Sequence, residues 1–463
     1  MKDKSPTRRR KAPKAVTLPP QLAHVNLCAA GIDVGSQSHW VAVPVDLAPA
    51  EPVREFGHFT ADLESLADWL VSIGVTTVVM ESTGVYWIAL FEVLEERGLE
   101  VLLVNARHVK NVPGRKTDVL DCQWLQQLHT YGLLRGAFRP PEQVCALRSY
   151  LRQRAMLVSG AASHIQHMQK ALTQMNLVLH TVVSDITGVT GMKIIHALLD
   201  GERDPLVLAG FRDRRCQHDE ATIAKALQGH YREEHLFALR QSVELYEFYH
   251  QQISACDAAI EYQLQQFDSQ TDEPITPPPR LRKAVGNALR FDARSELYRM
   301  TGVDLTRIDG LDAATALVVI AEIGLNMSRW PTAKHFASWL HLCPGNHVSG
   351  GKRLSGRSKP GVNRAANALR MAAASLHHSK SALGAYLRRQ KARLGAPKAI
   401  TATAHKLARL VYSMLKYGSE YVDAGQDYYE QQYQQKVVKN LRRRAQAMGF
   451  ELVEIGPAAP AVT

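Results

Sequence analysis

Acidic residues are missing from one long stretch of this sequence. No aspartate or glutamate occurs between Gly324 and Ser419, although charged residues make up 22% of the whole chain. Lysines and arginines continue through that stretch, and the chain as a whole has 56 basic against 44 acidic residues, a formal net charge of +12. The mutual repulsion of the cations in such a segment is relieved when it contacts a polyanion, and nucleic acid is the usual polyanion. The charge pattern therefore indicates a nucleic-acid-binding surface in the C-terminal half.

Cysteine motifs and long apolar runs are also lacking. The 6 cysteines form no CxxC pair and no Cys/His zinc spacing, so we expect reduced thiols. No segment reaches the ~18 uninterrupted apolar residues of a membrane span, because even the apolar run at 313–325 is interrupted by Glu322. The segment from Met1 to about Leu22 is basic and proline-rich and lacks the apolar region of a secretory signal. These absences favour a soluble, cytoplasmic protein with a basic N-terminal arm.

Acids are few in the first quarter of the chain, but two of them end apolar runs. Asp33 lies between the apolar segment 29–32 and a glycine turn, so we place it in a strand next to that turn. Glu81 ends the run 76–80 and therefore lies at the carboxyl end of a second strand. In α/β sheets that end of the strands presents the functional site.

Two further acids follow a third predicted strand at 100–104. Thr117 or Asp118 can cap a helix that continues through Asp121 and Cys122. Since Asp118 and Asp121 are three residues apart, they share one face of that helix.

Together these four carboxylates match the needs of a hard divalent cation. Mg²⁺ prefers oxygen ligands, and two such ions roughly 4 Å apart hold the attacking and leaving oxygens of a phosphodiester. Each acid alone has a simpler explanation: turn chemistry for Asp33, a solvated strand end for Glu81 and a helix cap for Asp118. The order strand, strand, helix pair favours a shared metal site.

A serine followed by two glycines lies inside the acid-free stretch, in Ser349-Gly350-Gly351-Lys352. Ser349 is either a nucleophile presented to a phosphodiester or a turn serine in a phosphate-binding nest, and the residues alone favour the nest. Ser355 is the local rival for the nucleophilic role. The cations predicted to contact nucleic acid around it are Lys352, Arg353, Arg357, Lys359, Arg364 and Arg370.

Helical patterns dominate the chain after residue 140. The pattern at 219–267 predicts a helical hairpin or short coiled coil, which is equally consistent with a spacer and with dimerisation. The proline-rich segment 274–279 predicts a stiff linker, and basic amphipathic helices are expected at 363–377 and 398–416. The predicted division is a disordered basic tail (1–24), an α/β domain (25–140), a helical or coiled-coil region (141–280), a C-terminal domain (281–425) and a charged tail (426–463).

These motifs resemble the DEDD-type insertion-sequence transposases of the "one-ten" family. GIDVGSQSHWVAV with Asp33, VVMESTGVYW with Glu81 and KTDVLDCQWL with Asp118 and Asp121 are similar to its carboxylate tetrad. The segments from IDGLDAATALVVIAEIG to FASWLHLCPGNHVSGGKRLSG are similar to its second signature region. The resemblance covers most of residues 29–180 and 305–420, while residues 211–300 are longer and more irregular than the family pattern.

The resemblance implies a fold and a mechanism. It implies an α/β N-terminal ribonuclease-H-like (RuvC-like) domain, a largely α-helical middle and a C-terminal serine transposase domain. It assigns Mg²⁺ to the four carboxylates, and by position Ser349 becomes the nucleophile that attacks DNA. It also implies donor and target DNA and a guiding bridge RNA as partners, and a nucleoid-associated bacterial enzyme. The assembly is expected to be a homodimer that forms a homotetramer, with composite sites shared between protomers.

Two other functions remain open from the sequence. In a Mg²⁺-dependent RuvC-like junction nuclease, water would attack the phosphate and Ser349 would only bind it; a covalent protein–DNA adduct separates the two. GIDVGSQS also resembles the first phosphate loop of actin-like and sugar kinases. That alternative needs a second glycine-rich loop and an adenosine motif, which are not found, and it leaves the acid-free basic half unexplained.

Overall fold

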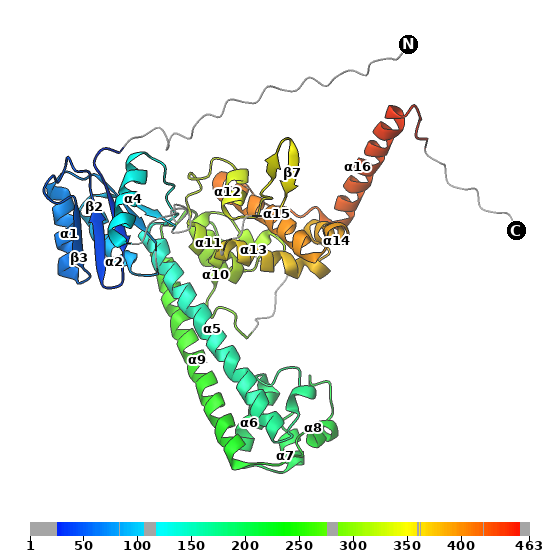
Figure 1. Ribbon diagram of the computed structural model, residues 1–463. Coiled ribbons are helices and arrows are strands. Elements are labelled where there is room, and N and C mark those ends of the chain that lie inside the picture. Colours follow the sequence, from blue (N-terminus) through cyan, green and yellow to red (C-terminus); the bar gives the residue numbers. More distant parts are fainter. Residues whose placement is uncertain are drawn as a thin grey trace. The chain divides into compact units, whose positions relative to one another are not determined.

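The computed structural model describes residues 26–82, 84–105, 117–275, 286–358, 361, 363–419 and 421–453. The chain divides into two compact units, Met1–Arg139 and Pro140–Thr463 (Figure 1). The expected linker at 274–279 and the boundary near residue 280 fall largely outside the described residues. All six cysteines are free thiols, as expected. No helix in the described ranges combines the length and the apolar character that crossing a lipid bilayer requires.

The N-terminal unit contains a mixed five-stranded sheet in the order β3-β2-β1-β4-β5. β1, β4 and β5 run parallel, whereas β2 pairs antiparallel with β1 and β3. The strands predicted around Asp33, Glu81 and 100–104 are confirmed, while the edge strand β3 has no apolar run that predicts it. The strands are β1 (Ala29–Val34), β2 (Ser38–Ala42), β3 (Val53–Gly57), β4 (Thr77–Glu81) and β5 (Glu100–Val104).

Different helices cover the two faces of this sheet. On one face, buried leucines of α1 and α2 pack with Ile32 and Met80. On the other face, Leu125 of α4 packs with Val79 and Val104. Alternate residues along each strand therefore face different helices. The helices are α1 (Thr60–Ser72), α2 (Trp87–Glu96) and α4 (Asp118–Thr130).

Two long helices of the second unit, α5 and α9, have 33 residues each and lie side by side (Figure 1). The unit begins with α5, and α9 follows after three short α-helices. The helical hairpin expected within 219–267 is not formed there, because α9 pairs with α5 from much earlier in the chain. Arg154 and Asp257 form a buried ion pair between the two helices. Short helices enclose an apolar core where the pair ends. The elements are α5 (Glu142–Gln174), η2 (Leu179–Thr181), α6 (Val189–Leu199), α7 (Pro205–Ala209), α8 (Glu220–Ala226) and α9 (Glu233–Gln265).

The remainder of this unit is helical apart from one small hairpin. Trp330, Phe336 and Tyr412 form an aromatic centre, in which the Tyr412 hydroxyl donates a hydrogen bond of 2.7 Å to the carbonyl oxygen of Trp330. The helices predicted at 363–377 and 398–416 are confirmed as α13 and α15. The elements are α10 (Ala293–Thr301), η3 (Leu305–Arg307), α11 (Ala313–Ile323), α12 (Ala333–Trp339), β6 (His347–Ser349), β7 (Lys352–Ser355), α13 (Arg364–Ser375), η4 (Leu376–His378), α14 (Ala382–Leu394), α15 (Ala396–Tyr417) and α16 (Gly425–Ala447).

Candidate active site and nucleic-acid interface

Two of the predicted carboxylates lie opposite each other on neighbouring strands. β1 and β4 pair in parallel with Ile32 opposite Met80, so Asp33 and Glu81 occupy the next equivalent positions. Neighbouring strands are about 4.8 Å apart, and residues in register point to the same face. Gly31 and Val79, two residues earlier, face α4, and therefore the two acids face the α4 side of the sheet. Both side chains are partly buried.

The other two carboxylates lie on the first turn of α4. Thr117 is the N-cap, and its hydroxyl accepts a hydrogen bond of 3.4 Å from the backbone N–H of Leu120. Asp118 is exposed, whereas Asp121 is partly buried. Acids in this turn interact favourably with the positive end of the helix dipole. The sequence thus predicted both the start of the helix and its acidic first turn.

Gly31 determines how closely α4 approaches the sheet. A Cβ atom at this position would lie 2.3 Å from the backbone nitrogen of Gln126 and 2.5 Å from the carbonyl oxygen of Cys122. No side chain fits there, so the helix backbone lies directly on β1. The sequence places Gly31 in the strand before Asp33 and gives it no role of its own, and only the packing of α4 shows that it acts as a spacer.

The close approach brings the two acidic elements within electrostatic reach of one thiol. Burial, then the charge of Asp33 and more weakly that of Asp121, raises the pKa of the Cys122 thiol to about 12. A strand acid and a helix acid of the predicted set therefore act on the same side chain. Asp33, Glu81 and Asp121 each have a further interaction partner.

The donor set fits a hard cation in its chemistry. All four predicted ligands are carboxylates. Asp33 and Glu81 are in register on adjacent strands, and the charges of Asp33 and Asp121 both raise the pKa of the Cys122 thiol. Carboxylate oxygens are what Mg²⁺ prefers. Among the described residues, however, no three His, Cys, Asp or Glu side chains are already spaced to hold a metal ion. The described structure therefore brings Asp33, Glu81 and the start of α4 to one side of the sheet without forming a coordination shell.

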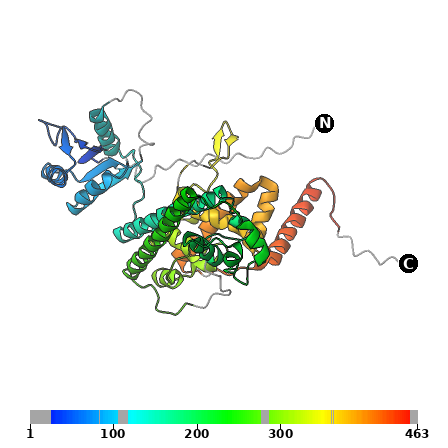
Figure 2. The same ribbon diagram turned by 90° about the horizontal axis from the view of Figure 1, so that it is seen from below.

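Ser349 ends the first strand of the β6–β7 hairpin. It pairs with Lys352 across the two-residue turn Gly350-Gly351. Both glycines have positive φ, 54° and 77°, and the space beside each is open, so the turn conformation requires glycine there and no close neighbour does. Ser349 is exposed, and the hairpin stands away from the neighbouring helices in both views (Figures 1 and 2).

Ser355 has different surroundings from Ser349. It lies on β7 opposite His347, and its hydroxyl oxygen accepts a hydrogen bond of 3.2 Å from the backbone N–H of Arg357. It is also partly buried. Of the two serines, Ser349 has the hydroxyl that a large substrate reaches more readily.

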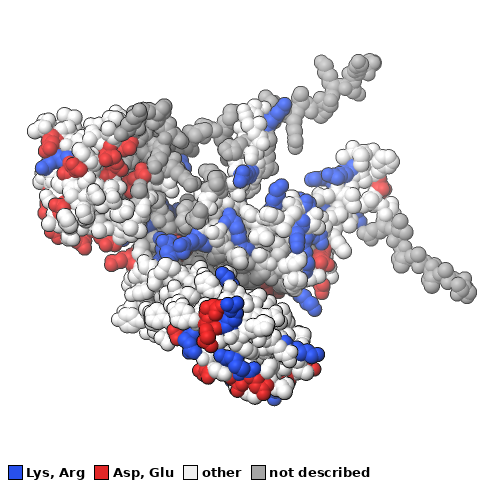
Figure 3. Space-filling model, turned by 60° about the horizontal axis from the view of Figure 1, so that its bottom comes forward, with Lys and Arg blue, Asp and Glu red and all other residues white. Residues whose placement is uncertain are grey.

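The cations predicted to bind nucleic acid lie on and after this hairpin. Lys352, Arg357 and Arg364 are exposed, while Arg370 is partly buried and donates a hydrogen bond of 2.9 Å to Asn367 Oδ1. None of these four forms an ion pair with a carboxylate within the described ranges. Lys359 and the side chain of Arg353 lie outside the described part of the chain. In Figure 3, acidic side chains gather on the visible face of the N-terminal unit, and lysines and arginines predominate over the C-terminal helices.

Two protein-family models match the sequence. Residues 30–177 match a DEDD transposase model described as "Transposase", and residues 302–388 match a model described as "Transposase IS116/IS110/IS902 family". Together the two matches cover just over half of the 463 residues. No curated protein matches the chain. These two matches, the first of which covers the mixed sheet, define a transposase, an enzyme that cleaves DNA strands and transfers them.

Within that class, the chain belongs to the IS110 family of DEDD transposases. The first matched segment contains all four predicted carboxylates, and the second contains Ser349 and the cations around it. The family predicted from the sequence motifs is therefore confirmed.

Proposed function

We propose that the protein is the RNA-guided transposase of a bacterial insertion sequence and that it works through a serine-linked DNA intermediate. Ser349 is the nucleophile, and Asp33, Glu81, Asp118 and Asp121 hold Mg²⁺ in a ribonuclease-H-like (RuvC-like) domain. The observation that carries this proposal is the pairing of β1 with β4, which puts Asp33 and Glu81 in register on the face of the sheet that α4 covers.

The proposed reaction exchanges one phosphate ester for another. The Ser349 Oγ attacks the phosphorus and gives up its proton, an Oγ–P bond forms, and the bond from phosphorus to one sugar oxygen breaks. That oxygen takes up a proton and leaves as a free hydroxyl. A hydroxyl of the new strand end then reverses the step, so that rejoining needs no external energy source.

Residues around the serine supply charge for this exchange. Lys352, opposite Ser349 across the turn, and Arg357 are exposed cations that can contact the phosphate oxygens. When bound, a divalent cation at the four carboxylates polarises the phosphate and stabilises charge on the leaving oxygen. The carboxylates and Ser349 belong to different compact units. This division is compatible with composite sites in a homotetramer built from dimers, where one protomer supplies the acids and another the serine.

The guide is proposed to be a structured bridge RNA that pairs with donor and target DNA. Family membership and the basic C-terminal surface support this part of the proposal, since a guide RNA adds a large polyanion to the DNA.

Removal of the nucleophile tests the proposal. Ser349→Ala should abolish recombination completely and leave DNA and RNA binding intact, because an exposed serine at a hairpin turn contributes little to stability. Loss of one phosphate hydrogen bond would instead cost about 1–3 kcal/mol, a weakening of at most a couple of hundredfold. Stalled wild-type reactions should yield labelled DNA attached to a peptide that contains Ser349, detected by denaturing gel and mass spectrometry.

The matched control is Ser355→Ala, which should retain the adduct and most of the recombination activity. An adduct mapped to Ser355 would transfer the role to that residue. Efficient cleavage by Ser349→Ala without any adduct would favour a nuclease that uses water.

A second substitution tests the role of the carboxylates independently of the serine. Asp121→Asn should abolish strand cleavage with little change in nucleic-acid binding, because it removes one anionic oxygen ligand and keeps the shape of the side chain. Glu64→Gln, an exposed acid on α1, is the control. A normal cleavage rate for Asp121→Asn in Mg²⁺ would remove Asp121 from the site.

A further inference from the structure

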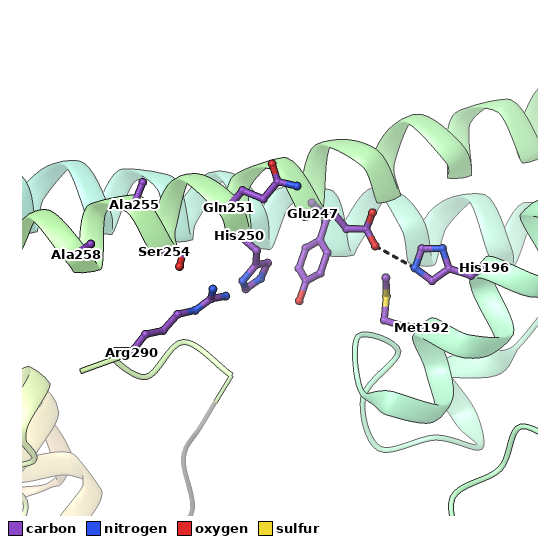
Figure 4. A pocket seen from close by; sticks show the side chains of 10 residues that line it. Met192, His196, Glu247, His250, Gln251, Ser254, Ala255, Ala258 and Arg290 are labelled. Carbon is purple, nitrogen blue, oxygen red and sulfur yellow. Dashed lines mark ion pairs between the residues drawn. The ribbon is translucent and has the colours of Figure 1, made fainter. Parts of the chain in front are cut away.

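A cavity of about 820 Å³ lies along α9 in the second unit (Figure 4). Its volume is within the roughly 300–1,000 Å³ typical of small-ligand sites. The lining residues come from α6, α9 and the segment before α10, which lie outside both segments matched by the family models. They are Met192, His196, Tyr246, Glu247, His250, Gln251, Ser254, Ala255, Ala258 and Arg290.

Arg290 gives the cavity a positive end. It is exposed and forms no ion pair with an acid of the described residues. Its chain segment is fixed to the helix pair by Arg154, whose Nη2 donates hydrogen bonds to the carbonyl oxygens of Asn287 (3.1 Å) and Ala288 (3.2 Å). The charge of Arg290 acts on His250, whose pKa is lowered by burial first and by this arginine second. An exposed arginine on an anchored backbone segment, next to a partly buried histidine ring, is suited to an anion that carries a flat group.

The wall of the cavity supplies the surface for that flat group. The rings of Tyr246 and His250 lie with centroids 4.4 Å apart at 61°, and both residues are partly buried, so part of each ring remains accessible. Gln251 and Ser254 add hydrogen-bond donors and acceptors, while Ala255 and Ala258 leave room beside them. Unpaired bases are recognised by just these means, ring stacking together with hydrogen bonds to the base edge.

The only acid among the lining residues is paired with a histidine at the end of the cavity opposite Arg290. Glu247 Oε1 lies 3.0 Å from His196 Nε2, and the pair is drawn as a dashed line in Figure 4. Glu247 therefore already has a partner, and it lies away from Arg290, where an anionic ligand would enter.

We propose that this cavity binds an unpaired nucleotide of a nucleic-acid strand, with its phosphate at Arg290 and its base against Tyr246 and His250. The inference rests on the proposed function only for the presence of nucleic acid. A duplex keeps its bases stacked and paired, so it cannot place one in a cavity of this size. The site therefore selects a bulge, a loop or a single-stranded end.

The test uses the full-length protein and single-stranded RNA and DNA octamers, with the same sequences as duplexes for comparison. Arg290→Ala and His250→Ala should each weaken single-strand binding about tenfold, in line with the loss of one stacked or charge-assisted contact. Duplex binding should stay unchanged. Gln252→Ala is the matched control for Gln251→Ala, since Gln252 is the exposed neighbour that does not line the cavity; only Gln251→Ala should weaken single-strand binding.

A thiouridine in the octamer provides a second readout by photocrosslinking. The crosslink should map to the α9 peptide that contains His250. An excess of unlabelled octamer should abolish it, whereas the same excess of free mononucleotide should not. Equal single-strand affinity of wild type and Arg290→Ala overturns the inference, as does a crosslink elsewhere or equal competition by free AMP, which would make the cavity a small-molecule site. Retained binding by Arg290→Lys, which keeps the positive charge, together with thermal melting of each variant, excludes loss of folding as the cause of weaker binding. Formation of the Ser349 adduct on a preformed duplex is measured in parallel, so failure of this site and failure of the proposed chemistry are told apart.

Discussion

At the scale of single residues, burial controls the behaviour of two titratable side chains on α4. Cys122 lies beside Asp33 and Asp121, and its raised pKa keeps it a neutral thiol at physiological pH. His129, near the other end of the helix, is buried, and its Nε2 lies 2.9 Å from the Thr77 hydroxyl at the start of β4. Neither residue has a pattern that predicts this role, because a lone cysteine or histidine in a sequence carries no information on its burial.

The burial of His129 predicts a pH dependence of stability. Desolvation lowers its pKa from 6.5 to about 4, so between these values the unfolded chain binds a proton that the folded chain does not. The free energy of unfolding should therefore be highest above pH 6.5 and should fall as the pH decreases toward 4, by at most about 3 kcal/mol. Thermal melting of wild type and His129→Gln across pH 4–7 measures this. If the stability of His129→Gln fell equally steeply as the pH decreased, the pH dependence would be due to other groups.

At the scale of elements, the sequence predicted those parts of the site that local rules determine. β1 and β4 are buried runs with an acid at or near the end, and α4 begins at a threonine cap followed by acids. The pairing of α5 with α9 was outside such rules, because an apolar stripe shows that a helix needs a partner but not which partner it takes. The cavity along α9 depends on that pairing and on the hydrogen bonds from Arg154 to the segment before α10, so no linear motif indicates it.

The contact between β1 and α4 gives the prediction at this scale. Gly31→Ala inserts a methyl group 2.3 Å from the backbone nitrogen of Gln126, so the helix must move away from the sheet. We expect a loss of about 1–3 kcal/mol or more in stability and a larger loss of cleavage, because Asp118 and Asp121 move with the helix. Gly286→Ala, where an added Cβ meets nothing within 4 Å, should change neither. Wild-type melting and cleavage for Gly31→Ala would show that α4 does not lie so close to β1.

At the scale of the whole molecule, charge is divided between the two units. The four carboxylates proposed to hold a metal ion are in the first unit, whereas the acid-free stretch from Gly324 to Ser419 is in the second. Several cations of that stretch have structural roles. Lys416, for example, donates hydrogen bonds to the carbonyl oxygens of Trp330 and Pro331. The sequence alone therefore overstates how many positive charges are available to phosphates, and the structure identifies Arg364 as one that remains exposed at the start of α13.

This distribution predicts how nucleic-acid binding responds to salt. Binding should weaken steeply as salt increases, with a log–log slope of roughly −0.9 for each duplex phosphate neutralised. Replacing Arg364 and Arg370 together by glutamine should flatten the slope by up to about 1.8, two phosphate contacts, if both arginines face the nucleic acid. Arg97→Gln is the control, because Arg97 is engaged with Asp68 at 2.8 Å in the first unit. Affinities measured by fluorescence anisotropy between low and moderate salt give the slopes. A slope unchanged in the double variant would place α13 away from the nucleic acid and would assign the salt dependence to the hairpin cations Lys352 and Arg357, whose replacement is the next measurement.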